Sequence, residues 1–319
     1  MKFPLDDAIF NYCRRHGVAV FCGAVILLGI GMHLTVRDDV PYPLFALFYA
    51  LPRPLLLSMS VTGMLAGRTR VMRWSFAAIA LALGAWVALC DVSWNGPANQ
   101  ALAGEQVVFW NVGHNLVEDS VAVDEMLATS PLVVGLVETG TLTPEWLAAW
   151  QARHTDYTFV VPHQGMLLAV RGSVLGQAYH RLPHNSHVAW VETRIEGRRV
   201  RVALVDLVAN PLISRGDTLR RLTERLAAWD DRPLVVMGDF NTPVESVWMM
   251  PIRRQFREAF LTAGTGYIPT WPWPLPVLKL DQIWINRLVD VRHAGQTGTW
   301  RSDHRVQWAR LAILAPPSE

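Results

Sequence analysis

An uncharged apolar run at residues 17–34, GVAVFCGAVILLGIGMHL, constrains the fold of this chain more than any other feature. A helix needs about 20 apolar residues to cross the hydrocarbon core of a bilayer. Arg14 and Arg15 precede the run, as basic residues precede many membrane spans. A cleaved signal peptide is the alternative, but the run continues as MHLTVRDDV without a small-residue cleavage site. We therefore expect a retained transmembrane helix.

Two further apolar segments follow before residue 93. Residues 43–66 are apolar but contain the sequence PRP near their centre, so this segment is predicted to be either a kinked span or a re-entrant hairpin. Residues 74–92 are apolar and uncharged almost to their end. Together with the first run, these segments predict a transmembrane anchor of two or three α-helical segments over residues 1–92.

The distribution of basic residues predicts how the anchor crosses the membrane. Lys and Arg lie before the first run and again between the second and third, at Lys2, Arg14, Arg15, Arg68, Arg70 and Arg73. Cytoplasmic loops are enriched in Lys and Arg, so both regions are predicted to be cytoplasmic. Three spans then place everything after residue 92 outside the cytoplasm, whereas two spans place it inside. We predict the first arrangement, in the cell (inner) membrane with the globular part on the extracytoplasmic side.

The remainder of the chain divides into a linker and a globular domain. Residues 93–104, SWNGPANQALAG, are rich in small and turn-forming residues and predict the linker. In the predicted domain, residues 105–319, 21 Lys and Arg nearly balance 22 Asp and Glu, which does not favour an avid, non-specific nucleic-acid binder. All three cysteines precede residue 91, so the domain can contain neither a disulfide nor a cysteine-ligated metal.

The domain has the mixed pattern of an α/β fold. Short apolar segments bounded by turn residues predict strands at Val107–Trp110, Leu132–Val137, Met166–Val170, His187–Ile195, Arg199–Leu207, Leu234–Met237, Leu280–Ile285 and Val306–Leu314. Apolar residues at helical spacing predict helices at Asp119–Thr129 and Asp217–Trp229.

Polar residues stand at the ends of several predicted strands. The clearest case is PLVVMGDFNTP at residues 233–243, where a buried strand stops at a glycine and is followed by a carboxylate and a carboxamide. The residues at strand ends are Asn111, Glu138, Asp239, Asn241, Asp281, Asp303 and His304. Carboxylates are costly to bury unless a metal or another partner holds them. We therefore predict that these side chains converge on one site.

The ordered set of motifs resembles the endonuclease/exonuclease/phosphatase superfamily, which includes DNase I-like nucleases. The segments that carry the resemblance are Trp110-Asn111, GLVETG around Glu138, Gly238-Asp239-Phe240-Asn241, Leu280-Asp281-Gln282-Ile283 and Ser302-Asp303-His304. They cover roughly residues 105–314. The resemblance implies two packed β-sheets flanked by helices, with the site at one edge of the sandwich, and a metal-dependent phosphoester hydrolase that uses Mg²⁺ or Mn²⁺.

The resemblance also implies a role for each residue. Glu138, together with Asn111 and Asp303, would hold the metal through hard oxygen ligands. Asp239 would orient or deprotonate the attacking water, and Asn241 would stabilise the charge that develops on the phosphoryl group. His304, held by Asp281, would contact the scissile phosphate.

The chain departs from the superfamily at two places. Members usually carry a His or Tyr on the strand before GDFN, but here the sequence is ALVDLVANP, with Asp206 or Asn210 at the expected position. Val137 stands where Gln is more common. Outside the motifs, His184 and His187 precede a predicted strand and could reach the substrate, although a polar surface loop is the simpler interpretation.

Three functions are consistent with these observations. The first is a membrane-tethered phosphodiesterase with endonuclease-like chemistry and a nucleic-acid substrate. The second is a phospholipid or phosphomonoester hydrolase, favoured by the anchor and by the tryptophan-rich segment TWPWPLP at residues 270–276. The third is a catalytically weakened binding or scaffold protein, suggested by the missing His or Tyr. No protein partner can be inferred.

Overall fold

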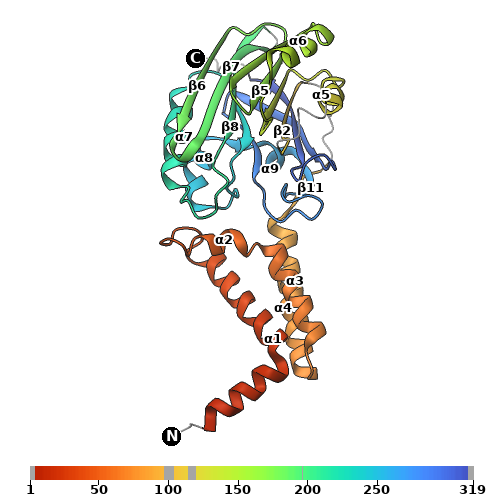
Figure 1. Cartoon of the computed structure of the whole chain (residues 1–319), viewed down its shortest axis with the longest axis vertical. Coiled ribbons are helices and arrows are strands. Elements are labelled where there is room, and N and C mark those ends of the chain that lie inside the picture. The colour runs from red at the N-terminus through yellow and green to blue at the C-terminus, as the bar shows by residue number, and fades with distance from the viewer. Residues whose placement is uncertain (1–3, 97–103, 114–119, 196, 315–319) are drawn as a thin grey trace. The chain divides into compact units, whose positions relative to one another are not determined.

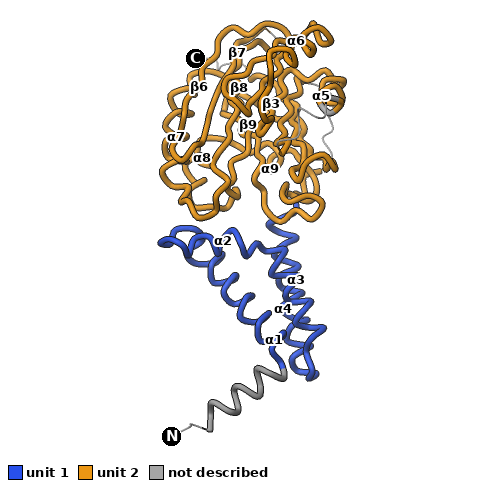
Figure 2. Tube along the Cα trace, in the orientation of Figure 1, with its two compact units in different colours: residues 1–92 blue, residues 93–319 orange. Residues whose placement is uncertain are grey.

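The computed structural model describes residues 4–96, 104–113, 120–195 and 197–314. The chain forms two compact units, Met1–Val92 and Ser93–Glu319, called unit 1 and unit 2 (Figures 1 and 2). The predicted linker at residues 93–104 lies largely outside the described residues. Within unit 2, the Ser93 hydroxyl donates to the Gly264 carbonyl oxygen at 2.7 Å.

Unit 1 is helical. Its elements are α1 (Pro4–Leu34), α2 (Ala46–Ala50), α3 (Arg53–Ala66) and α4 (Arg70–Cys90). Among the described residues, two helical segments are long and apolar enough to cross a membrane, His16–Leu34 and Arg70–Cys90. α3 has 14 residues, about 21 Å at 1.5 Å per residue, and is therefore shorter than a bilayer core. The helix starts at the PRP sequence, because proline is tolerated in a first helical turn but not in a helix interior.

Contacts within unit 1 fix the directions of its helices. Gly23 of α1 lies against Phe76 of α4, and ten residues later the His33 ring packs edge-on against Trp86 at 5.7 Å between centroids. α1 and α4 therefore run in the same direction. α3 runs the opposite way, because Arg53 at its start forms a buried ion pair of 2.6 Å with Asp91, at the end of α4.

Unit 2 contains two six-stranded sheets packed face to face (Figure 1). The first sheet has the order β10-β12-β9-β8-β7-β6, with bounds Arg257–Glu258, Asp281–Ile285, Leu234–Asp239, Arg198–Asp206, Ser186–Ile195 and Gly176–Leu182. The second has the order β13-β14-β2-β3-β5-β4, with bounds Val289–Thr297, Val306–Ile313, Glu105–Asn111, Val133–Val137, Met166–Arg171 and Tyr157–His163. β1 (Val92–Trp94) pairs with β11 (Thr265–Tyr267). The predicted two-sheet α/β sandwich is confirmed.

Helices cover the outer faces of the sheets. α7 (Gly216–Ala228) and α8 (Met250–Gln255) pack on the first sheet, and α5 (Ser120–Leu127) and α6 (Pro144–Arg153) pack on the second. The short α9 (Ala259–Ala263) contributes to the core between the sheets, and two 3-10 turns lie at Pro183–Asn185 and Val247–Met249. α7 buries leucines at helical spacing on one face, as the sequence predicts.

The inner faces of the two sheets form the main core, and their alternation leads directly to the site. Alternate residues of each strand point inward. On β9 these are Val235 and Met237, and on β8 they are Val202 and Leu204, all fully buried. The next inward positions, at the ends of these strands, are Asp239 and Asp206. Asp206 and Asp239 therefore continue these two rows of inward-facing residues beyond the apolar core, at the edge of the sandwich.

Gly238 shows how closely β8 and β9 approach at this edge. A Cβ atom at Gly238 would lie 2.1 Å from the carbonyl oxygen of Val205, a backbone atom that cannot rotate away. We expect Gly238→Ala to lower the free energy of unfolding of unit 2 by about 3 kcal/mol or more, because overpacking against backbone cannot be relieved by a rotamer change. Thermal unfolding of the detergent-solubilised chain measures this effect.

Gly176→Ala is the matched control. A Cβ atom there would have its nearest neighbour at 3.6 Å, an ordinary contact with Trp190. This variant should unfold at nearly the temperature of the unsubstituted protein. Equal melting temperatures for both variants would contradict the prediction.

Candidate active site

Three aspartates form a row across neighbouring strands of the first sheet. Asp281 of β12 is the register partner of Asp239 of β9, which is in turn the register partner of Asp206 of β8. Register partners in a sheet present their side chains on the same face. All three therefore face the second sheet, where β2 ends at Asn111.

Asp239 is bonded to both sheets. Its Oδ2 accepts a hydrogen bond of 2.9 Å from Nδ2 of Asn111, across the gap between the sheets, and its Oδ1 accepts one of 2.8 Å from the backbone N–H of Asn241. Burial, followed by the charge of Asp281, raises the pKa of Asp239 to about 7. A carboxylate with a pKa near neutrality can accept a proton from water and release it again.

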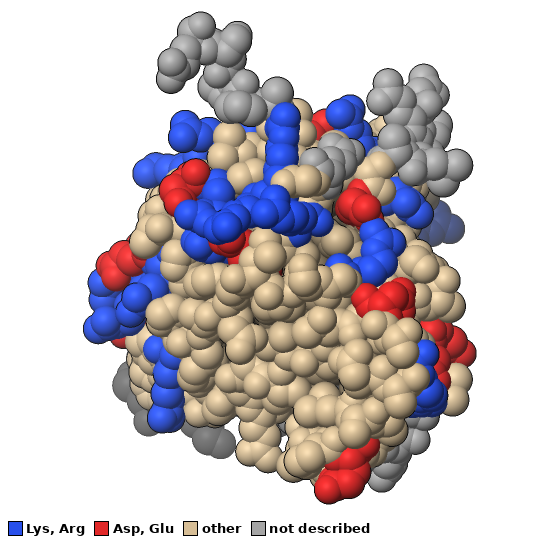
Figure 3. Space-filling model, turned by 90° about the horizontal axis from the view of Figure 1, so that it is seen from above, with Lys and Arg blue, Asp and Glu red and all other residues tan. Residues whose placement is uncertain are grey.

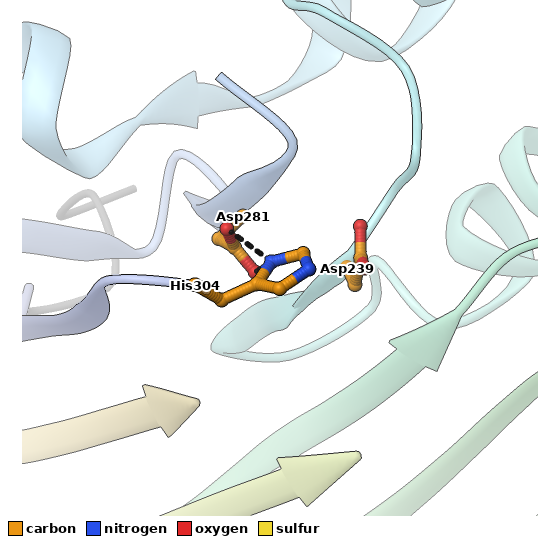
Figure 4. Close-up of side chains that lie close together, drawn as sticks. All are labelled: Asp239, Asp281 and His304. Atoms are coloured by element: carbon orange, nitrogen blue, oxygen red, sulfur yellow. Dashed lines mark hydrogen bonds and ion pairs between the residues drawn. The ribbon is translucent and has the colours of Figure 1, made fainter. Parts of the chain in front are cut away.

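His304 and Asp281 form a buried dyad (Figure 4). Nδ1 of His304 lies 3.0 Å and 2.9 Å from the two carboxylate oxygens of Asp281. Figure 4 shows the other ring nitrogen facing Asp239. Burial opposes protonation of the ring, but the charge and hydrogen bond of Asp281 outweigh it and raise the pKa of His304 to about 10. The imidazole is therefore charged at neutral pH, and its Nε2–H is a donor beside Asp239.

The loop before β14 is tied to the end of β2, which fixes the position of His304. The Ser302 hydroxyl donates to the Asn111 carbonyl oxygen at 2.8 Å and accepts from the backbone N–H of His304 at 3.0 Å. Nε1 of Trp110 donates to the His304 carbonyl oxygen at 3.2 Å. The motif residues at both ends of the domain sequence are thus part of one hydrogen-bonded structure.

Asn241 lies next to Asp239 in a left-handed backbone conformation, with φ of 45°. Its side-chain Nδ2 donates to the Leu207 carbonyl oxygen at 2.8 Å, and its backbone carbonyl oxygen accepts from Nε of Arg215 at 3.2 Å. The residue therefore joins the end of β9 to the segment that follows β8. One of its two amide N–H bonds is used by the contact with Leu207.

Glu138 faces the same part of the site. It follows β3 with a left-handed φ of 54° and is half-buried. Burial, followed by the charges of Asp239 and Glu138, raises the pKa of Asp206 to about 8. These carboxylates repel one another, so negatively charged oxygens lie close together here. A hard divalent cation favours such an environment.

A second set of potential metal ligands overlaps the dyad. One ligand atom from each of Asp239, Asp281 and His304 lies within 4.8 Å of the others. Both Asp281 oxygens, however, are within hydrogen-bonding distance of His304 Nδ1. We therefore interpret Asp281 and His304 as an oriented acid–imidazole pair.

Asp303 and Asn210 lie in more exposed surroundings. Oδ2 of Asp303 accepts a hydrogen bond of 2.8 Å from Nε1 of Trp271, and its Oδ1 is 4.0 Å from Nε2 of His304. Oδ1 of Asn210 accepts from the backbone N–H of Leu212 at 2.9 Å, within an exposed turn. Of the two residues that could replace the missing His or Tyr, the structure brings Asp206 into the row and places Asn210 in this turn.

Two residues near the site were not assigned to it from sequence. Arg215 was not considered, and the interpretation of His187 as part of a polar surface loop is wrong, because His187 lies within β7 and is only 5% exposed. His187 of β7 is the register partner of Asp206 and extends the row by one strand. The alternation of His187 with inward-facing Ala189 and Val191 was the signal that could have identified it. Arg215 is buried and donates to carbonyl oxygens of the surrounding turn, those of Ala209, Asn210, Ile213 and Asn241.

Arginines gather at the end of unit 2 opposite the site. Figure 3 shows this end, which includes the β7–β8 hairpin. From Arg198 to Asp206 along β8 the chain extends about 26 Å at 3.3 Å per residue. Several of these arginines are paired: Arg199 and Arg232 with Glu192, and Arg171 with Glu105. These arginines therefore lie away from the site and do not frame it.

The sequence matches the group described as "Endonuclease/Exonuclease/phosphatase family" over residues 108–304. A search of curated protein sequences gave no significant match.

Solved structures with the same fold are distant in sequence. The human Nocturnin catalytic domain with bound sulfate has 18% identity and a TM-score of 0.53, covering 70% of this chain and 95% of that one. D. rerio TDP2 complexed with single-strand DNA product has 16% identity and a TM-score of 0.55, covering 66% and 100%. The 3' phosphatase NExo from Neisseria, bound to product DNA hairpin, has 17% identity and a TM-score of 0.54, covering 65% and 99%.

Proposed function

Because the chain belongs to the endonuclease/exonuclease/phosphatase family, we propose that it is a membrane-tethered, metal-dependent phosphoester hydrolase that acts on phosphodiesters. One observation carries the proposal. Asp239 is held by Asn111 across the two sheets and lies beside the His304–Asp281 dyad. A base, an oriented imidazolium and converging oxygen ligands are groups that promote in-line attack of water on phosphorus.

Each residue has a role that follows from its surroundings. Asp239 orients the attacking water and accepts its proton. His304, charged and fixed by Asp281, donates from Nε2 to a phosphoryl oxygen as negative charge develops. Asn241 has a further amide N–H for the same charge. Glu138 and Asn111, with Asp303, would hold Mg²⁺ or Mn²⁺, which when bound polarises a phosphoryl oxygen and lowers the pKa of water.

The dyad and the cross-sheet hydrogen bond favour an enzyme over a scaffold, because a scaffold has no need of a charged imidazole in a buried position. Among the neighbours, TDP2 is bound to a DNA product and NExo is a 3' phosphatase bound to a DNA hairpin. These precedents support a nucleotide-type ester as the substrate. The same precedents are consistent with a phosphomonoester.

A second candidate is a phospholipid head group, and one observation favours it. Leu275 and Trp300 are 80% and 84% exposed, and Trp300 packs against Trp273 at 6.2 Å between ring centroids. Trp271 of the same segment donates to Asp303 in the site loop. Exposed leucine and tryptophan side chains partition favourably into a membrane interface.

We also propose that unit 1 anchors the chain in the cell (inner) membrane and that unit 2 lies outside the cytoplasm. Within unit 1, α1 and α4 run in the same direction and α3 returns between them. If both apolar helices cross the bilayer, the chain leaves α4 on the side opposite its N-terminus. The basic residues near the N-terminus and near residue 70 favour the cytoplasm for those ends.

The first experiment measures hydrolysis by the full chain in detergent micelles. The substrates are two p-nitrophenyl diesters, of thymidine 5'-monophosphate and of methyl phosphate, and the monoester p-nitrophenyl phosphate. We expect diester turnover with Mg²⁺ or Mn²⁺ that EDTA abolishes and added metal restores. Metal at 100 times its dissociation constant should also stabilise the fold by about 2.7 kcal/mol, measured as a raised melting temperature. Turnover that resists EDTA, or none on any ester, would refute the proposal.

A further inference from the structure

The row of polar residues continues beyond the site to His187. His187 on β7 pairs in register with Asp206 on β8, so the two side chains lie on the same face of the sheet. Two strand spacings of about 4.8 Å separate His187 from Asp239, or about 10 Å. This spacing is between strand backbones, and it places His187 one position beyond Asp206 along the row. A group esterified to a phosphorus bound beside Asp239 can extend along the row as far as His187.

His187 belongs to a stack of three rings from both sheets. Its imidazole stacks on that of His163, from the end of β4, at 4.2 Å between centroids and 26° between ring planes. Tyr179 of β6 stacks on His163 at 5.0 Å, and its hydroxyl lies 2.8 Å from Nδ1 of His187. His187 is only 5% exposed, whereas the other two rings are half-buried. The stack therefore fixes the orientation of the His187 ring.

The hydrogen bond between Tyr179 and His187 links the choice of donor to the tautomer of the His187 ring. Burial, then the charges of His163 and Arg181, lowers the pKa of His187 to about 4, so the ring is neutral. Burial raises the pKa of Tyr179, so the phenol keeps its proton, and its hydroxyl can either donate to Nδ1 or accept from it. In the tautomer whose Nδ1 accepts from Tyr179, Nε2 carries the ring hydrogen, and this is the tautomer that the subsite requires. Among the residues that the structure describes, no acceptor is bonded to this nitrogen.

We propose that the His163–Tyr179–His187 stack is a subsite for the substituent esterified to the scissile phosphorus, in which Nε2–H of His187 donates to an oxygen of that substituent. The inference rests on the proposed phosphodiester hydrolysis and specifies its substrate class as a nucleotide diester. A nucleoside can make both kinds of contact. Its sugar oxygen or hydroxyls can accept the hydrogen bond, and its flat base can lie against the aromatic rings. Tyr179 acts as a positioning residue.

The test compares two diesters that react by the same chemistry. The p-nitrophenyl ester of thymidine 5'-monophosphate carries a nucleoside, and methyl p-nitrophenyl phosphate carries a methyl group in its place. We expect His187→Phe, which keeps a stacked ring but removes the donor, to lower kcat/KM for the nucleotide by about 10- to 100-fold. Turnover of the methyl ester should be unchanged. His187→Gln places an amide N–H near the position of Nε2 and should restore part of the loss.

His180→Phe is the matched control. His180 is the sequence neighbour of Tyr179 on β6, and its ring packs on Trp229 of the outer cluster at 5.5 Å. Its replacement should leave both diesters unaffected. Tyr179→Phe should lower kcat/KM for the nucleotide in the otherwise unsubstituted protein but have no further effect in the His187→Phe protein. A merely structural role for the hydroxyl would give additive losses in this double-mutant cycle.

The outcomes separate this inference from the proposed function. Equal losses on both diesters, or no loss on either, would overturn the subsite while leaving the hydrolase intact. If the unsubstituted protein hydrolyses neither diester, the proposed function fails, and calorimetric binding of thymidine 5'-monophosphate against methyl phosphate becomes the test. Tighter binding of the nucleotide that His187→Phe abolishes would then support the subsite. Equal or absent binding would overturn it.

Discussion

Replacing Asp239 by asparagine should lower kcat for the diester by about 10³-fold, within the range that positioned acid–base groups contribute. The substitution keeps the size of the side chain and one oxygen acceptor for Asn111 or for the backbone N–H of Asn241. What it removes is the group that can take a proton from water. The measurement is steady-state hydrolysis of the thymidine diester by the full chain at saturating metal.

The same substitution should not lower the thermal stability of the metal-free protein. In the metal-free protein, burial raises the pKa of Asp239 to about 7 from an ordinary value of 3.8. A carboxyl with a raised folded-state pKa favours folding when protonated, and this contribution is lost as the pH rises from about 4 through about 7. At pH 8 a neutral asparagine avoids that loss. We therefore expect metal-free Asp239→Asn to melt no lower than the unsubstituted protein.

Asp217→Asn is the control, because Asp217 is an exposed carboxylate on α7. Its replacement should leave kcat unchanged. A loss of activity in Asp239→Asn that is accompanied by a lower melting temperature would indicate a structural role for Asp239. Retention of activity would remove Asp239 from the mechanism.

The strands that the sequence did not predict lie at the edges of the sheets. All eight predicted strands are present, as β2, β3, β5, β7, β8, β9, β12 and β14. The longer strands that were missed, β4, β6 and β13, each terminate a six-stranded sheet. An edge strand is covered on fewer sides, so polar residues such as those in GQAYHRL of β6 are tolerated and the apolar pattern weakens. Pattern reading therefore finds the interior of each sheet more readily than its edges.

The alternation of inward and outward side chains along each strand predicts that the site residues converge. It does not predict which of them form contacts. Val235, Met237 and Asp239 occupy successive inward positions, so the sequence predicts that Asp239 lies at the edge of the core. The hydrogen bond between Asn111 and Asp239 depends on how two sheets stack, which no local pattern encodes. For the same reason the register of His187 with Asp206, two residues from different strands, became visible only in the fold.

The remaining large effect is expected from the dyad, and it depends on pH. Asp281→Asn keeps an oxygen acceptor for His304 Nδ1 but removes the charge that, with its hydrogen bond, raises the pKa of that ring to about 10. Burial is then opposed only by the charges of Asp239 and Asp303, so the pKa of the ring falls. Since the imidazolium is the donor to the phosphoryl oxygen, kcat should fall as the pH rises through the new, lower pKa.

We expect kcat of Asp281→Asn to be about 10²-fold below that of the unsubstituted protein at pH 9, with a smaller deficit at pH 6. The unsubstituted protein should show no loss from this group over that range, because its His304 stays charged. His304→Gln should lose activity at every pH. Adding Asp281→Asn to it should lower kcat little further, since the two residues act together as a single proton donor. Parallel pH profiles for Asp281→Asn and the unsubstituted protein would mean that Asp281 orients the ring without controlling its charge.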